Sequence, residues 1–208
     1  MAAVLLGAWV LHETVRYYDP ARVAAREQLA ARKIPPDPLS LYVRANINDL
    51  EAVRLLLDAG LSPNRARDHR GRSALMAAVS NANLEAVDLL LKRGADPNQI
   101  TNEGFTALYI ASMKGYPEIV HGLLTAGADP NVGDVNGSTP LLAAVSLECW
   151  DWGLRAGARR TVIVRDLLAA GARVNVSDSS GTTVLAEAER CYPQLLPALR
   201  AAALKATS

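Results

Sequence analysis

The chain has 208 residues, of which half are hydrophobic and about a fifth are charged, and its formal net charge is +1. This balance is typical of a globular protein and excludes a wholly disordered chain. A net charge so close to zero also disfavours a general nucleic-acid binder, which normally carries a basic excess. The two cysteines, Cys149 and Cys191, indicate neither a metal-ligand pair nor a disulfide framework.

The chain begins with an apolar run from Ala2 to Leu11. As a helix this run would rise only about 15 Å, roughly half the thickness of a bilayer core. It has the length of a signal-peptide core, but no lysine or arginine precedes it. We interpret it either as an apolar helix without an assigned partner or as a membrane-associated end.

Location depends on this run. Basic residues follow it at Arg16, Arg22, Arg26, Arg32 and Lys33. By the positive-inside tendency they would hold the next domain in the cytoplasm, so a cytoplasmic location is expected. A membrane-associated or periplasmic location is the alternative if residues 2–11 belong to an anchor or a signal.

A second N-terminal helix is predicted from Ala21 to Ile34. Asp19 and Pro20 suit its N-cap and its first turn. We expect this helix to pack against the first repeat, and Pro35 to Pro38 to end it as a stiff spacer.

A five-residue signature recurs along the rest of the chain. The sequence Gly-Ala-Asp-Pro-Asn occupies residues 94–98 and 127–131, with weaker copies at 60–64 and 171–175. The asparagines that end the four segments lie 34, 33 and 44 residues apart, so the last interval holds one repeat and 11 inserted residues. A period near 33 residues is typical of a solenoid built from helix pairs.

Each repeat carries the signals of two helices. Leucine clusters at helical spacing mark the buried face of a second helix, and a glycine follows each at the C-cap position. Aspartates placed three residues before a glycine predict the intervening turns, and Ser or Thr then caps a short apolar first helix. The glycines are Gly60, Gly94, Gly127 and Gly171; the aspartates are Asp68, Asp134 and Asp178; the N-caps are Ser73, Thr106, Thr139 and Thr183.

These features resemble the ankyrin-repeat family over residues 38–204. Thr139-Pro140-Leu141-Leu142 is similar to the family's Thr-Pro-Leu-His motif, and looser copies at 106–109 and 73–76 also lack the histidine. The resemblance implies an all-α solenoid of about five stacked helix-turn-helix units with hairpin-like loops, plus an N-terminal helical extension over residues 1–37. The expected units are 38–64, 65–98, 99–131, 132–175 with an insertion near 147–160, and 176–204 as a C-terminal cap.

The resemblance also implies a non-catalytic protein-protein interaction module. We expect an adaptor or regulatory subunit that binds a partner protein through finger loops and first helices, and that is monomeric on its own. The alternative is a membrane-tethered or periplasmic stabiliser of a partner enzyme. No phosphate loop, nucleophile motif or paired metal ligands occur in the sequence, and His12, His69 and His121 have no carboxylate or thiol at a catalytic spacing. We therefore expect no catalytic residues, no metal and no cofactor.

Two surface features are candidate binding sites at the positions that ankyrin modules use. The first, the basic cluster, is either a solvated loop or an electrostatic anchor for an acidic partner segment. The second, the apolar stripe, is either an anchor for a partner or a set of contacts between neighbouring fingers. The basic cluster is Arg65, Arg67, His69, Arg70 and Arg72, and the apolar stripe is Phe105, Met113, Val135 and Leu147.

The remaining candidate positions lie beside these features and in the insertion. Asn102, Glu103, Lys114 and Asn136 occupy variable positions that the resemblance assigns to recognition. Trp150 and Trp152 in the insertion either pin it to adjacent helices or present a knob to a partner, since tryptophan is enriched at interfaces.

Overall fold

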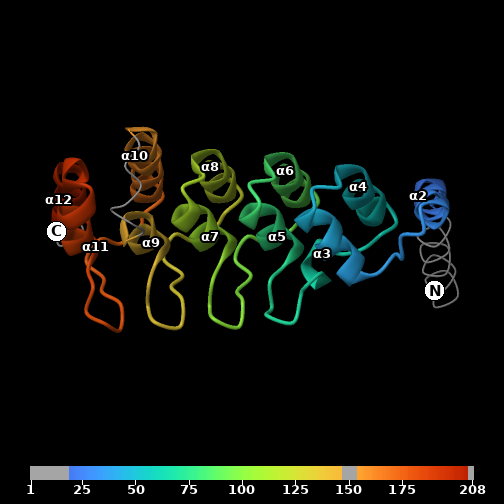
Figure 1. The fold of residues 1–208 in the computed structure, drawn as a ribbon, viewed down its shortest axis with the longest axis horizontal. Helices are drawn as coiled ribbons and strands as arrows, with labels where there is room; N and C mark the ends of the chain where they lie inside the picture. The colour runs from blue at the N-terminus through green and yellow to red at the C-terminus, as the bar shows by residue number, and fades with distance from the viewer. Residues whose placement is uncertain (1–18, 147–153, 206–208) are drawn as a thin grey trace, which may run out of the picture.

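The computed structural model describes residues 19–146 and 154–205 (Figure 1). In these residues the helices stand in two rows that run along the molecule, and four hairpin loops project beyond the first row. The first row holds α3 (Pro38–Asn46), α5 (Ala74–Ser80), α7 (Ala107–Lys114), α9 (Pro140–Ser146) and α11 (Val184–Cys191). The second row holds α2 (Pro20–Ala31), α4 (Leu50–Asp58), α6 (Leu84–Lys92), α8 (Pro117–Thr125), α10 (Leu154–Ala169) and α12 (Leu196–Lys205). Two short 3-10 helices complete the chain order: η1 (Pro63–Arg65) follows α4, and η2 (Pro193–Leu195) precedes α12. The predicted all-α solenoid is confirmed.

Four of the first helices begin where the sequence predicts their N-caps, whereas α2 ends at Ala31 and not at the predicted Ile34, and α10 begins at Leu154, within the predicted insertion. The Ser73 and Thr106 hydroxyls accept hydrogen bonds from the amides of Met76 and Tyr109, at 3.2 and 3.0 Å. Thr139 and Thr183 cap α9 and α11 in the same way. These caps satisfy amides that the first turn of a helix leaves without a partner.

Glycine ends the second helices because the chain there needs a left-handed backbone. Gly94 and Gly127 have φ of +81° and +88°, a region that other residues enter only with strain. The same conformation at Gly60 and Gly171 turns the chain into the next loop at every repeat.

The core is continuous along the solenoid. Each of four successive second helices contributes a leucine with no exposed surface, and the first helices cover these leucines with small or aliphatic residues. No single helix pair is able to bury this surface alone, so the units stabilise one another. The four leucines are Leu56, Leu90, Leu123 and Leu167.

An asparagine ladder ties each repeat to the next. The Asn98 side chain donates to the Gly127 carbonyl at 3.0 Å and accepts from the Asp129 amide at 2.8 Å. Asn64 and Asn131 make the same pair of bonds to the following unit, and Asn175 donates to the Ala203 carbonyl near the end of α12. The recurring Pro-Asn signature is therefore a connector between units as well as a turn.

The predicted N-terminal helix forms α2 and packs against α4, which confirms its expected contact with the first repeat. Asp19 caps it through the Ala21 amide at 3.0 Å. Ala25 and Leu29 are buried against the solenoid, and Arg32 forms an ion pair with Glu51. None of the helices in the described ranges is long and apolar enough to span a bilayer.

One expectation about the cysteines is wrong, because Cys191 is disulfide-bonded. Disulfide formation depends on the distance between two Cα atoms in the fold, so cysteines without a local motif give no signal in the sequence. The other cysteine, Cys149, lies outside the described residues, as do residues 2–11, Leu147, Trp150 and Trp152.

Candidate partner-binding surface

Four hairpin loops form a comb along one side of the molecule (Figure 1). We call them fingers 1 to 4; they span residues 66–73, 99–106, 132–139 and 176–183. Their tips are joined by backbone hydrogen bonds, from Asn102 to Arg70, from Val135 to Glu103 and from Ser179 to Asn136, at 3.0, 3.0 and 2.7 Å. Since the tips are linked in register, the comb presents side chains from a preorganised backbone.

In three of the fingers an aspartate carboxylate accepts hydrogen bonds from backbone amides of its own turn; the residues are Asp68, Asp134 and Asp178. In finger 1 the Asp68 carboxylate accepts from the amides of Arg70 and Arg72, at 2.9 and 2.8 Å. Burial raises the pKa of Asp68, but hydrogen bonds from the backbone and side chain of Arg72 outweigh this effect, so the pKa lies below its usual range. In finger 4 the Ser180 hydroxyl is the main cause of a lowered pKa at Asp178. These carboxylates are charged parts of the turns.

Arg72 belongs to the same turn. Its Nε donates to Asp68 at 2.8 Å, and its guanidinium lies 5.9 Å from the centroid of the Tyr42 ring. The Tyr42 hydroxyl donates to the same carboxylate oxygen as Arg72 Nε, at 3.1 Å from Asp68 Oδ2. Of the five residues in the basic cluster, Arg72 is therefore held by the protein's own groups, and the contact with Tyr42 is one that no sequence spacing indicates.

The rest of the basic cluster faces solvent. Arg65, Arg67, His69 and Arg70 are exposed, and Arg67 makes one long contact, 3.5 Å, to the Ile100 carbonyl. In the described ranges the only salt bridge within this cluster is the one between Arg72 and Asp68. Finger 1 and the residue before it thus present three arginines without an acidic neighbour bound to them.

The apolar stripe is only partly assembled in the described residues. Phe105 is half-buried against the core and stacks on Tyr109, with ring centroids 4.8 Å apart. Met113 is half-buried, Lys114 is exposed, and Val135 on finger 3 is the most exposed member. The stacking explains why a large aromatic residue occupies this variable position.

Arg160, at the end of the predicted insertion, ties α10 to the first row. Arg160 on α10 donates through Nη2 to the Met113 carbonyl at 2.8 Å and through Nη1 to the Ser112 carbonyl. These carbonyls end α7, where the helix dipole also favours a positive charge. Arg160 therefore caps the C-terminal end of α7, the helix that carries Met113 and Lys114. The sequence gives no signal for this contact, because Arg160 and Met113 lie 47 residues apart.

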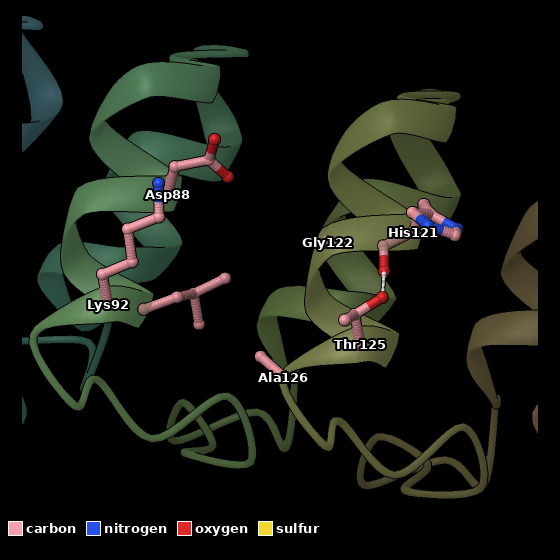
Figure 2. Close-up of a pocket in the computed structure, with 7 residues that line it drawn as sticks. Asp88, Lys92, His121, Gly122, Thr125 and Ala126 are labelled. Carbon is pink, nitrogen blue, oxygen red and sulfur yellow. Dashed lines mark hydrogen bonds between the residues drawn. The ribbon is translucent and has the colours of Figure 1, made fainter.

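Two shallow grooves run between second-row helices. Figure 2 shows the groove between α6 and α8, where Asp88 and Lys92 lie across from Thr125 and Ala126. A second groove between α8 and α10 includes His121, Arg165 and Asp166. The linings mix acidic, basic and apolar groups, so neither groove selects an evident ligand class.

His121 has a carboxylate partner that its sequence neighbours do not reveal. Its Nδ1 lies 3.6 Å from Asp166 Oδ2, and Arg165 also contacts Asp166, at 3.1 Å. No sequence spacing indicates this pair, because it forms only when α8 stacks on α10. The nearby Thr125 hydroxyl donates to the His121 carbonyl at 2.9 Å, as Figure 2 shows, so it is not aligned as a nucleophile.

The pair lies at an exposed helix-helix contact. The imidazole of His121 is largely open to water. Water screens the attraction between exposed groups, so the contact with Asp166 contributes little to stability. Among the described residues no group of histidine, cysteine, aspartate and glutamate is arranged to hold a metal ion. We therefore assign the pair to the packing of neighbouring units.

Comparison with known proteins identifies the repeats. A family model for ankyrin repeats, in three copies, matches residues 39–134. A search of curated proteins found no match to the chain. Ankyrin repeats generally mediate protein-protein interactions and are generally non-catalytic modules. Together with the paired helices, the linked fingers and the asparagine ladder, the match shows that residues 39–134 are ankyrin repeats within an all-α solenoid.

Proposed function

We propose that the chain is a non-catalytic adaptor or regulatory subunit that binds a partner protein through its fingers and first helices. The observation that carries the proposal is the exposed basic cluster on a comb of linked fingers. Arg65, Arg67 and Arg70 lie in the open, whereas Arg72 beside them is held by Asp68. The partner we propose presents an acidic segment to these three arginines.

Rigidity and charge support this proposal together. Finger 1 is braced by the Asp68 turn and by the backbone bond from Asn102 to Arg70, so its arginines project from an ordered loop. Less ordering is then needed on binding, which favours affinity. Arginine also pairs with carboxylates in a two-pronged geometry that lysine lacks. Local charge of one sign would further speed the encounter with an acidic partner.

The apolar residues next to the basic cluster would complete the interface. Phe105, Met113 and Val135 offer apolar surface on the neighbouring units. Phe105 and Met113 are half-buried, whereas Val135 on finger 3 is largely exposed. The exposed residues Asn102, Glu103, Lys114 and Asn136 would form a polar rim around them, which is the usual anatomy of an interface. Leu147, Trp150 and Trp152 remain part of the proposal as residues of the insertion.

The test is charge reversal at the exposed arginines. The variant R65E/R67E/R70E should recover a partner from the native source at least about tenfold less efficiently than the wild type, since each change replaces attraction by repulsion. The matched control is R54E/K92E/R159E, which makes the same change of charge at exposed positions of the second row. Recovery is measured by mass spectrometry, and circular dichroism shows that all three proteins are folded.

The control should recover the partner as the wild type does, and raising the salt concentration should weaken the wild-type complex. A partner recovered equally by the wild type and by R65E/R67E/R70E would exclude the basic cluster as the anchor. Equal losses in both variants would indicate an effect of net charge and would also contradict the proposed site.

A periplasmic stabiliser of a partner enzyme is a second candidate, favoured by the disulfide at Cys191. Disulfides persist mainly in oxidising compartments. If the protein acts there, native material alkylated without reductant should leave Cys191 unlabelled, and labelling should follow reduction. Trypsin releases residues 191–200 as one peptide, so mass spectrometry measures this directly. Full labelling before reduction would exclude this candidate.

A further inference from the structure

The two rows of helices do not end together at the N-terminal side. In the second row α2 packs against α4 and extends the row by one helix (Figure 1). In the first row, no helix of the described residues lies beyond α3. Within residues 19–146 and 154–205, the second row therefore begins with a helix that has no first-row partner, unlike the helices of the other units.

The outer face of α3 is apolar and exposed. We use this name for Leu39, Val43 and Ile47, which follow one another at four-residue spacing and so share one side of the helix. They are 59%, 41% and 57% exposed. Large aliphatic residues at regular spacing on one helix face normally meet another helix.

The next unit shows what such a face contacts. The segments 50–57 and 84–91 differ at one position, and this register places Val43 opposite Ala77 and Ile47 opposite Asn81. Ala77 is 1% exposed, and the Asn81 side chain donates to the Asn46 carbonyl at 3.0 Å. This face of α5 is therefore directed at the preceding first helix, α3. By the same geometry, the outer face of α3 is directed at the place of a first helix one unit earlier.

The chain supplies a segment for that place. In the described units a first helix comes just before its second helix, with three residues between α3 and α4 and three between α5 and α6. The residues before α2 include the apolar run 2–11, which the repeats do not use. Residues 12–18 would span up to about 23 Å when extended, more than the roughly 10 Å between packed helices.

We propose that residues 2–11 form this missing first helix and cover the outer face of α3. The run has no charged residue, as a helix buried on this face requires. With α2 it would complete a unit that caps the N-terminal end of the solenoid, where terminal units must cover core that has no further neighbour. A bilayer and a second copy of the chain are the competing occupants.

Tryptophan fluorescence tests the proposal in the full chain. The variant W150F/W152F keeps Trp9 as its only tryptophan, and Trp9 is the eighth of the ten residues in the run. Trp9 should emit at shorter wavelength in buffer than in guanidinium chloride, because the outer face of α3 shields it from water. Adding Val43→Asp should shift the emission to longer wavelength, whereas Val135→Asp, the same change on finger 3, should not.

A second variant guards against unfolding of α3. Ile47→Asn places at this position the residue that its equivalent, Asn81, already carries, and it should shift Trp9 emission in the same direction as Val43→Asp. Circular dichroism checks the helix content of each variant. Emission that neither Val43→Asp nor Ile47→Asn moves would overturn the proposal.

The competing occupants give different results, and each would overturn it. Trp9 emission that shifts to shorter wavelength only with vesicles of phosphatidylglycerol and phosphatidylcholine would assign the run to a membrane. A short-wavelength emission that is lost on dilution, as sedimentation shows a dimer dissociating, would assign it to a second copy.

Discussion

Replacing Arg160 by alanine should lower the free energy of unfolding by roughly 3 kcal/mol, because two hydrogen bonds from a charged group to half-buried carbonyls are lost. The Ser112 and Met113 carbonyls at the end of α7 would be left without this donor, and the favourable charge near the helix dipole would be gone. Denaturation with urea, followed by circular dichroism, measures the change.

Arg159→Ala is the matched control for this change. Arg159 is the preceding residue of the same helix and is exposed, so its loss should change the free energy of unfolding by less than about 0.5 kcal/mol. Similar effects of Arg159→Ala and Arg160→Ala would mean that the contact with α7 contributes nothing beyond general charge. Lysine at position 160 should restore only part of the stability, because one ammonium lacks the two-pronged reach of a guanidinium.

Replacing Asn98 by alanine should lower the free energy of unfolding by about 2 kcal/mol. The change removes the donor to the Gly127 carbonyl and the acceptor for the Asp129 amide, and so cuts the ladder in the middle of the solenoid. Thermal unfolding should also become broader, since repeat proteins depend on the coupling between neighbouring units.

Asn136→Ala provides the comparison for the ladder. Asn136 is an exposed residue at the tip of finger 3, and its hydrogen bonds in the structure come from its backbone. Its replacement should change stability by less than about 0.5 kcal/mol. If Asn98→Ala is no more destabilising than Asn136→Ala, water replaces the ladder bonds without cost and the ladder is not a stabilising feature.

Local signals carried most of the fold prediction. The Thr106 cap, the left-handed Gly94 and the Asp68 turn each depend on residues within four positions, so their chemistry is readable from the sequence. The role of Asn98 was not readable in the same way. Its recurrence marks a repeat, but only the stacked structure shows that its amide binds the next unit.

For the candidate surface, the sequence indicated which residues are exposed, but it indicated less about which of them pair with other groups of the protein. The exposure of Arg65, Arg67 and Arg70 follows from their place on a loop, but the pairing of Arg72 depends on Asp68 and on Tyr42 from another unit. The contact of His121 with Asp166 likewise needs two helices that the 11-residue insertion separates further. The contacts of Tyr42 with Arg72 and of His121 with Asp166 join distant segments with no fixed spacing, so single-sequence reasoning has no signal for them.

The ladder has a consequence for how this chain tolerates change in length. Asn98 reaches a carbonyl 29 residues ahead, and Asn131 reaches the equivalent carbonyl 40 residues ahead, at 3.0 and 3.1 Å. These two links contact only backbone groups at the glycine that ends a second helix and at the residue two positions later, whatever lies between. We therefore expect that peptides of different length can be inserted between α9 and α10 without shifting the register of the units that follow.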